Sequence, residues 1–221
     1  MATALRTLLS WPSVSLAPEP TPVSELTRLR AALGPAAPRL LMKRDDLLSF
    51  GLGGNKVRKM QAVAAEARDA GATVLITCGG VQSNHARVTA ATGAVLGMKV
   101  ILIANGERPA HLTGNARLNA LFGAEVQYVA AREERAPAMA RAAEACAAAG
   151  ERPFVVPLGA STPVGAIGFA RGVQELVAAG HLPTAIVHAT SSGGTQAGLI
   201  AGCALVGLPA RVIGISADDP A

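Results

Sequence analysis

The stretch GLGGNKVRK, residues 51–59, places three glycines just before a lysine at the predicted start of a helix. Glycines let the backbone turn sharply and approach a ligand closely, and a lysine beyond them brings a primary amine to a fixed point in a cleft. Lys56 is therefore a candidate for chemistry. A solvated lysine at a helix start is an equally acceptable interpretation of this stretch alone.

Two nucleotide-binding patterns do not fit this stretch. The phosphate-binding loop G-x-x-x-x-G-K-[ST] needs its lysine next to a glycine, but Asn55 separates Gly54 from Lys56. Val57 also takes the position of the required serine or threonine. The dinucleotide pattern G-x-G-x-x-G puts its third glycine where Lys56 stands. A nucleoside triphosphatase and a nicotinamide enzyme are therefore disfavoured.

The composition favours an α/β protein with a small anionic ligand. Half of the 221 residues are hydrophobic and only 3% are aromatic, which suits helices packed on a parallel sheet. The net charge of +5 is scattered without a basic run, and no aromatic platform is present for stacking bases. We therefore expect no nucleic-acid partner. A mild positive balance fits small anions better.

The cysteines and the apolar segments indicate the cellular compartment. Cys78, Cys146 and Cys203 are odd in number and far apart, so we expect core residues rather than disulfides, and no metal site. The longest apolar stretch, residues 197–208, is too short to span a membrane. Residues 1–12 lack the features of a signal peptide. We expect a cytoplasmic protein with no membrane partner.

Strands and helices alternate along most of the chain. Residues 1–37 are predicted to form a strap over the main body, with a short helix at 24–33. Three βα repeats between residues 71 and 150 predict a small open parallel sheet. We expect strands at 39–43, 73–78, 99–104, 125–129, 154–157, 185–190 and 211–216. We expect helices at 60–70, 84–96, 112–122 and 135–149, a helix that follows residues 159–163 and ends near 179, and a helix that begins within residues 191–198.

A second glycine-rich turn, SSGGTQAG at residues 191–198, follows a strand and opens a helix. Backbone N–H groups at such a helix start, with hydroxyls beside them, bind anions. The turn contains no lysine and no acid, which favours a phosphate monoester over a polyphosphate. The alternative is that these residues only turn the chain and cap the helix.

A polar turn, QSNH at residues 82–85, follows the strand at 73–78. It does not match G-x-S-x-G, and Ser83 and His85 would lie on different faces of a helix, so a serine hydrolase is disfavoured. Polar groups at the carboxyl end of a strand face the ligand crevice of an open α/β sheet. For His85 alone, a hydrogen-bonded structural histidine is the commoner case. Ser83 or Asn84 suits the cap of the next helix.

An amine, an anion site and a polar turn, each at the end of a strand, point to one cofactor. Pyridoxal phosphate needs a lysine for its Schiff base, a site for one phosphate, and polar groups around its ring. Lys56, the 191–198 loop and the 82–85 turn supply these three requirements.

Four motifs follow one another along the chain: GGNKxRK at 53–59, GGxQSNHxR at 79–87, PLGAS at 157–161 and SGGTxAG at 192–198. Together they resemble the family of D-cysteine desulfhydrases and 1-aminocyclopropane-1-carboxylate deaminases. This resemblance implies the tryptophan-synthase β-like, fold-type II architecture, with two open, mostly parallel sheets flanked by helices. It implies a large cofactor-binding domain at 1–70 and 151–221, and a small α/β subdomain at 71–150.

The resemblance also implies roles for individual residues. Lys56 would bind the cofactor and move a proton at the substrate's α or β carbon, and Ser83 would act close to the reacting carbons. Asn84 would hydrogen-bond the ring oxygen of the cofactor. The phosphate would be held by Ser192, Gly193, Gly194 and Thr195, and the substrate would be faced by Gln82, Ser83 and His85.

The expected reaction is elimination of sulfide from D-cysteine, giving pyruvate and ammonia. The alternatives are opening of a cyclopropane amino acid, and a serine or threonine dehydratase. His85 resembles the desulfhydrases, because the deaminases compared have glutamine there. The family pattern continues beyond residue 221 with a tyrosine on the substrate side, whereas Tyr128 lies in the small subdomain. We therefore expect an incomplete large domain, dimeric when complete, with a catalytically silent remnant as the alternative.

Overall fold

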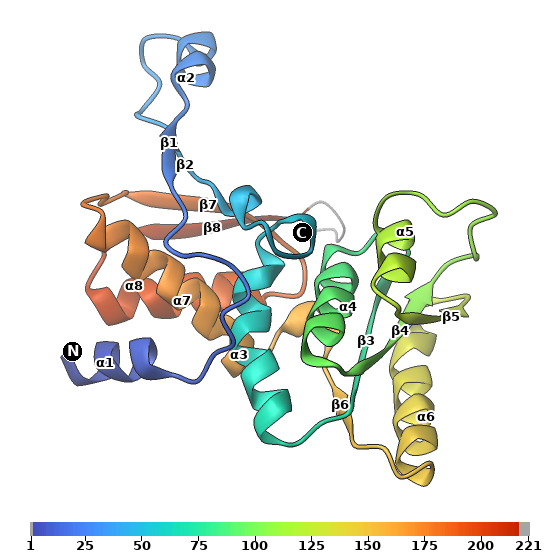
Figure 1. The fold of residues 1–221 in the computed structure, drawn as a ribbon. Coiled ribbons are helices and arrows are strands. Elements are labelled where there is room, and N and C mark those ends of the chain that lie inside the picture. Colours follow the sequence, from blue (N-terminus) through green and yellow to red (C-terminus); the bar gives the residue numbers. More distant parts are fainter. Residues whose placement is uncertain (1, 217–221) are drawn as a thin grey trace.

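The computed structural model describes residues 2–216, and one of its two units is built on a parallel sheet with strand order β5-β4-β3-β6 (Figure 1). Alternate side chains of the buried strands face opposite sides of this sheet. Leu75 and Leu102 pack toward α4, and Ile76 and Ile103 pack toward α6. The elements are β3 (Val74–Gly80), α4 (Asn84–Leu96), β4 (Lys99–Asn105), α5 (Gly114–Leu121), β5 (Glu125–Val129), α6 (Arg135–Ala148) and β6 (Pro153–Val155).

A second unit pairs two parallel strands under two helices. Ile186 and Val212 of the strands pack against Val173 and Leu199 of the helices. The helices approach closely because a Cβ on Gly202 would lie 2.9 Å from the Cα of a residue in the neighbouring helix. The elements are α7 (Pro163–Ala178), β7 (Ala185–Thr190), α8 (Gly194–Val206) and β8 (Arg211–Ser216).

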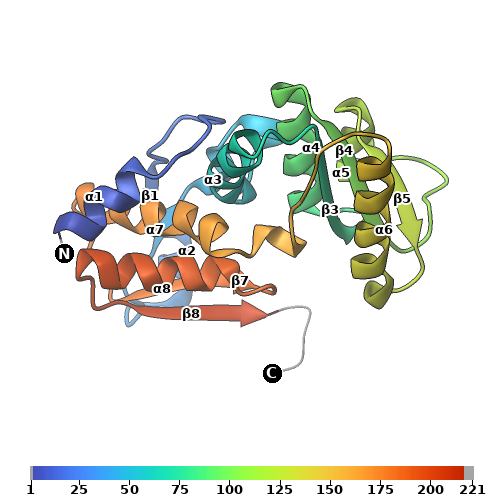
Figure 2. The ribbon, with the colours of Figure 1, turned by 90° about the horizontal axis from the view of Figure 1, so that it is seen from below.

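Helix α3 (Lys56–Asp69) lies between the two units, as both views show (Figures 1 and 2). Ten of its fourteen residues are buried, which explains its many small side chains. A Cβ on Gly168 of α7 would lie only 2.1 Å from the carbonyl oxygen of Arg58, so glycine permits this helix pair to pack closely. The start of α3 is thereby fixed against both units.

The N-terminal segment covers one side of this arrangement. Its helix α1 packs on α7 and α8 and was not predicted from the sequence. The predicted helix at 24–33 is shorter than expected, because residues 23–25 form a strand that pairs antiparallel with β2. The elements are α1 (Ala2–Ser10), β1 (Val23–Glu25), α2 (Thr27–Leu33), β2 (Leu41–Lys43) and the short 3-10 turns Asp45–Leu47, Phe50–Leu52, Arg132–Glu134 and Leu158–Ala160.

The predicted alternation of strands and helices is confirmed, with two parallel sheets flanked by helices. Strand β6 pairs with β3, so the four-stranded sheet extends to residue 155, beyond the predicted end of the small subdomain at 150. The division into domains stays a prediction. All three cysteines are buried, as expected. Between residues 2 and 216, no helix has the length and hydropathy needed to cross a bilayer.

Candidate active site

The glycine loop before α3 fixes the direction of Lys56, the first residue of that helix. Gly53 and Gly54 adopt φ values of +88° and +105°, which disfavour any residue with a Cβ. A Cβ on Gly53 would also lie 2.9 Å from the carbonyl oxygen of Asp46. Burial lowers the pKa of the Lys56 amine, because a partly dry environment disfavours its charged form.

Lys59, one helical turn further on, is the site residue that the sequence reasoning missed. Its side chain is 1% exposed, and its Nζ donates to the carbonyl of Gly159 at 2.9 Å and to Oγ of Ser161 at 3.4 Å. Burial, together with the charge of Lys56, lowers the pKa of Lys59 to about 8. Among residues 2–216 no carboxylate pairs with this amine. Lys59 is therefore a buried cation without an anion.

The predicted anion loop meets Lys59. Oγ of Ser192 lies 2.6 Å from Oγ of Ser161, which itself contacts the lysine. A Cβ on Gly194 would lie 2.7 Å from Nζ of Lys59, so only glycine leaves this space open. Gly193 caps α8 in a left-handed conformation, and the first backbone N–H groups of a helix lack partners within it. Lys59 therefore brings to the 191–198 loop a positive charge that the loop's own sequence lacks.

Ser83 caps helix α4, as one of the two predicted candidates. The backbone N–H of Ala86 donates to Oγ of Ser83 at 3.2 Å. The hydroxyl oxygen is an acceptor in this bond, so its own proton is free for a further partner. Ser83 therefore stabilises the helix start and still presents one donor.

The other polar residues of the turn contact the start of α5. The side-chain amide of Gln82 donates to the carbonyl of Thr113 at 3.1 Å and accepts from the backbone N–H of Asn115 at 2.8 Å. Oδ1 of Asn84 accepts from Nδ2 of Asn115 at 2.9 Å. Both amides of the turn are exposed, and both are oriented by residue 115. Asn115 lies in no motif that could have predicted this role.

His85 lies beneath the turn and is 3% exposed. The hydroxyl of Thr77 donates to the carbonyl of Val156 at 2.7 Å, so it must accept from Nε2 of His85, which lies 2.8 Å away. The proton is therefore on Nε2, and Nδ1 has no partner among residues 2–216. Burial, with the charges of Lys56 and Lys59, lowers the pKa of His85 to about 3. The ring is neutral at physiological pH.

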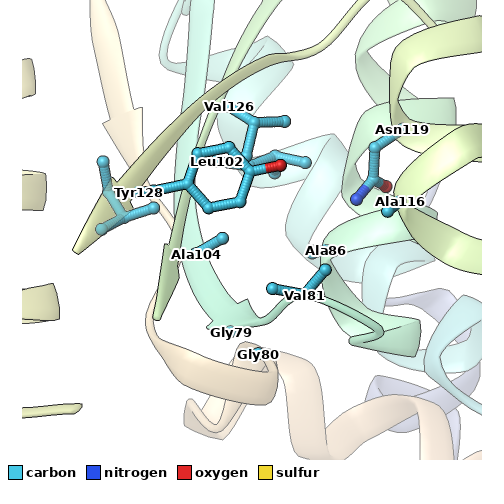
Figure 3. Close-up of a pocket in the computed structure, with 11 residues that line it drawn as sticks. Gly79, Gly80, Val81, Ala86, Leu102, Ala104, Ala116, Asn119, Val126 and Tyr128 are labelled. Atoms are coloured by element: carbon cyan, nitrogen blue, oxygen red, sulfur yellow. The ribbon is translucent and has the colours of Figure 1, made fainter. Parts of the chain in front are cut away.

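A small hollow between the four-stranded sheet and α5 is a separate feature (Figure 3). Its volume of about 10 Å³ holds at most one water molecule, so it does not suit an amino acid. Tyr128 and Asn119 line it, while neither lysine of the site does. We therefore keep the starts of α3, α4 and α8 as the candidate site.

The residues of this candidate site fit pyridoxal phosphate. Lys56 supplies an amine of lowered pKa, and Lys59 supplies a buried positive charge beside the 192–195 loop. A phosphate there would provide the anion that Lys59 lacks. Asn84 is exposed, and its hydrogen bond with Asn115 holds its side chain on the polar turn.

Comparisons with known proteins agree with this fit. The sequence profile described as "Pyridoxal-phosphate dependent enzyme" matches residues 14–221. A putative 1-aminocyclopropane-1-carboxylate deaminase of Pyrococcus abyssi is 38% identical over 216 residues, covering 96% of this chain and 64% of that protein. A D-cysteine desulfhydrase of Yersinia pestis is 36% identical over 222 residues, covering 97% and 66%. The chain thus spans about two thirds of the length of these relatives.

Solved structures show the same relationship. The structure titled as an ACC deaminase homologue superposes with a TM-score of 0.89 at 35% identity, covering 96% of this chain and 65% of that one. A threonine deaminase at 23% identity and a TM-score of 0.68 shares the fold. The predicted resemblance, the fold-type II architecture and the cofactor of the family are confirmed. The chain belongs to the family of pyridoxal-phosphate dependent enzymes.

Proposed function

We propose that the protein is a pyridoxal phosphate-dependent lyase or deaminase of a small amino acid, with D-cysteine as its first candidate substrate. The observation that carries this proposal is the meeting of Lys59 with the Ser192–Thr195 loop, next to the amine of Lys56. Because the chain spans about two thirds of its relatives, the activity is tested on this chain itself.

The residues that would hold the cofactor come from both units of the fold. Lys56 would bind its aldehyde carbon, and Asn84 would donate to its ring oxygen. Lys59 would face the phosphate together with Ser192, Gly193, Gly194 and Thr195. When bound, the cofactor supplies an electron sink for the electron pair left on the substrate's α carbon.

The proton chemistry rests on Lys56. Its lowered pKa leaves more of the amine uncharged near neutral pH, and an uncharged amine can take the proton from the α carbon. His85 stays neutral, so it adds no third positive charge beside Lys56 and Lys59 once Lys56 has taken up the proton.

Ser83 would bind the substrate. Its oxygen accepts from the backbone of α4, so its O–H proton can donate to the substrate's carboxylate. Gln82 would contact the substrate only through the edge of its amide that α5 leaves free. The overall reaction converts D-cysteine and water to pyruvate, ammonia and hydrogen sulfide.

A test starts from the purified chain with added pyridoxal phosphate. Borohydride reduction followed by peptide mass spectrometry should place the cofactor on Lys56, and the variant Lys56→Ala should show no adduct there. D-Cysteine should then yield equal amounts of sulfide and pyruvate. A reduced adduct at other lysines but not at Lys56 would overturn the proposal.

Deamination of 1-aminocyclopropane-1-carboxylate is the second candidate, because the relative from Pyrococcus abyssi is as similar as the desulfhydrases. That substrate and water would give 2-oxobutyrate and ammonia without sulfide. A substrate panel that includes serine and threonine separates these candidates by their keto-acid products. Cofactor on Lys56 without turnover of any substrate would indicate a catalytically silent chain.

A further inference from the structure

Asn115, at the start of α5, is the centre of a hydrogen-bond network that no step of the proposed reaction uses. Its Nδ2 donates to the backbone carbonyl of Gln82 at 2.7 Å and to Oδ1 of Asn84 at 2.9 Å. Its Oδ1 accepts from Nη1 of Arg87 at 3.0 Å. One side chain thus connects α5 with the turn that opens α4.

The orientation of the Asn115 amide follows from its partners. A guanidinium has only donors, so the atom of Asn115 that faces Arg87 must be the oxygen. A backbone carbonyl has only acceptors, so the atom that faces Gln82 must be the nitrogen. The two partners are independent and agree. The amide of Asn115 therefore has one orientation.

This orientation decides what Asn84 presents to the site. Because Nδ2 of Asn115 is a donor, the atom of Asn84 that it meets must be the acceptor Oδ1. Among residues 2–216, the NH₂ group of Asn84 then has no hydrogen-bond partner, and the side chain is exposed. Asn84 therefore presents its donor to a ligand, and a ligand that pairs with this donor must offer an acceptor there.

Arg87 ties this network to the lysine loop. Its side chain is buried at 7% exposure, and its Nη2 donates to the carbonyl of Gly53, three residues before Lys56. Among residues 2–216 no carboxylate pairs with Arg87. A Cβ on Gly114 would lie 2.7 Å from Oε1 of Gln82, so the start of α5 is shaped to receive the turn.

We propose that Asn115 is a positioning residue: held by Arg87, it orients Asn84 so that the NH₂ group of Asn84 donates to an acceptor oxygen on the ring of the bound cofactor. This inference rests on the proposed function. The network should favour the deprotonated form of the ring oxygen, because a fixed donor stabilises negative charge on its acceptor.

The first test uses the protein without cofactor. In Asn115→Asp, one carboxylate oxygen keeps the contact with Arg87, and the other faces the carbonyl of Gln82 and Oδ1 of Asn84. The Asn84 amide should then turn over, so that its NH₂ group donates to the new carboxylate. Side-chain amide NMR, assigned with the variant Asn84→Asp, should show the Asn84 signals shifted and exchanging more slowly. Unchanged signals overturn the inference.

The second test uses the loaded protein. Asn115→Asp should lower cofactor affinity by about tenfold or more, the usual effect of losing a hydrogen bond to a charged group. It should also raise, by about one unit, the pKa that is read from the pH dependence of the cofactor's visible absorption band. The control Arg117→Gln, which removes one positive charge at an exposed position of the same helix, should change neither quantity. Wild-type affinity with an unshifted band in Asn115→Asp overturns the inference.

The two tests separate the inference from the proposed function. If the wild-type chain takes up no cofactor on Lys56, the proposed function fails, while the NMR comparison still decides the orientation of Asn84. If the cofactor binds and Asn115→Asp leaves the Asn84 signals unchanged, only the positioning role of Asn115 fails.

Discussion

Helix α3 buries two neighbouring cations in opposite surroundings. Arg58 pairs with Asp45 at 2.8 Å, Glu175 at 2.8 Å and Glu19 at 3.2 Å. Lys59, the next residue, contacts two uncharged oxygens and the ring of Phe169, whose centroid lies 5.9 Å from Nζ. Burial alone would lower the pKa of Arg58, but its bonds to Glu175 and Asp45 raise it, whereas the pKa of Lys59 falls to about 8.

The difference teaches which buried charge serves the fold and which serves a ligand. A buried cation with its carboxylates in place is satisfied by the chain itself, and it holds several segments together. A buried cation without an anion raises the free energy of the folded state until a ligand supplies the missing charge. Within α3, Arg58 therefore organises the fold, and Lys59 is the cation that we propose a ligand pairs with.

The largest expected effect comes from removing Arg58, the buried cation that is paired with carboxylates. Arg58→Met should leave the carboxylates of Glu19, Asp45 and Glu175 buried with too few cations, and it should lower the free energy of unfolding by about 3–5 kcal/mol. Urea denaturation of both proteins measures the change. The control Arg39→Met breaks an exposed pair, whose members are 63% and 37% exposed, and should change stability by less than about 1 kcal/mol. Equal effects would contradict the structural role of Arg58.

Lys59→Met removes the buried cation that has no carboxylate partner among residues 2–216. It should raise the stability of the cofactor-free protein and weaken cofactor binding. The pKa of Lys59 is about 8 in the folded chain and 10.5 ordinarily, so the folded state disfavours its proton. This penalty is fully present below pH 8 and disappears as the pH rises toward 10.5. At pH 7 its removal, less the two lost hydrogen bonds, should stabilise the cofactor-free protein by about 1–2 kcal/mol.

Binding should show the reverse. Because Lys59 would face the cofactor's phosphate, Lys59→Met should weaken pyridoxal phosphate by about 10- to 100-fold, measured by absorbance titration. The control Lys99→Met removes an exposed lysine whose nearest carboxylates lie 3.8 Å away, and it should alter neither quantity. A cofactor-free Lys59→Met protein that is several kcal/mol less stable would place Lys59 with Arg58 as a structural cation.

His85→Gln tests whether the surroundings of Lys56 and Lys59 exclude a further positive charge. His85 keeps a pKa of about 3 when folded, below its ordinary 6.5, so the unfolded chain binds one more proton between these values. Stability should fall with decreasing pH across this window by about 1.4 kcal/mol per unit. His85→Gln should lose that slope, while His111→Gln, at an exposed site, should keep it. Identical slopes in wild type and His85→Gln would refute the neutral histidine beside Lys56 and Lys59.

The fold could be predicted from the sequence wherever local pattern decides structure. The strands at 125–129, 185–190 and 211–216 have the predicted bounds, because each is rich in β-branched or aromatic residues and begins two residues after a glycine or a proline. Strand β1 at 23–25 could not be predicted, because three residues become a strand only by pairing with residues 41–43. Helix α1 depends similarly on docking against α7 and α8.

The candidate site divides in the same way. Lys56 and the 191–198 loop could be predicted because each lies in a local motif. Lys59 could not, because it meets Gly159 across 100 residues of sequence. One signal was present: Lys59 follows Lys56 by three residues, so both amines project from one face of the helix. Asn115 lies 31 residues from Asn84 and has no motif of its own.

The smallest expected effect compares two helix caps, one on the ligand side and one away from it. Ser83 accepts from the N–H of Ala86 at 3.2 Å, and Thr162 accepts from the N–H of Gly165 at 2.9 Å. Ser83→Ala and Thr162→Ala should each lower stability by about 1 kcal/mol, since each removes one cap. Urea denaturation should not distinguish them.

Turnover should distinguish the two caps, because only Ser83 has a proton to offer in the polar turn beside Lys56. Ser83→Ala should lower kcat/KM by about tenfold or more beyond its effect on stability, through loss of a hydrogen bond to a charged carboxylate. Thr162→Ala should keep kcat/KM close to wild type at a temperature where both variants are folded. Equal kcat/KM values in the two variants would reduce Ser83 to a helix cap. Lys56 and Lys59 would then be the residues of this comparison that still have a proposed contact with a ligand.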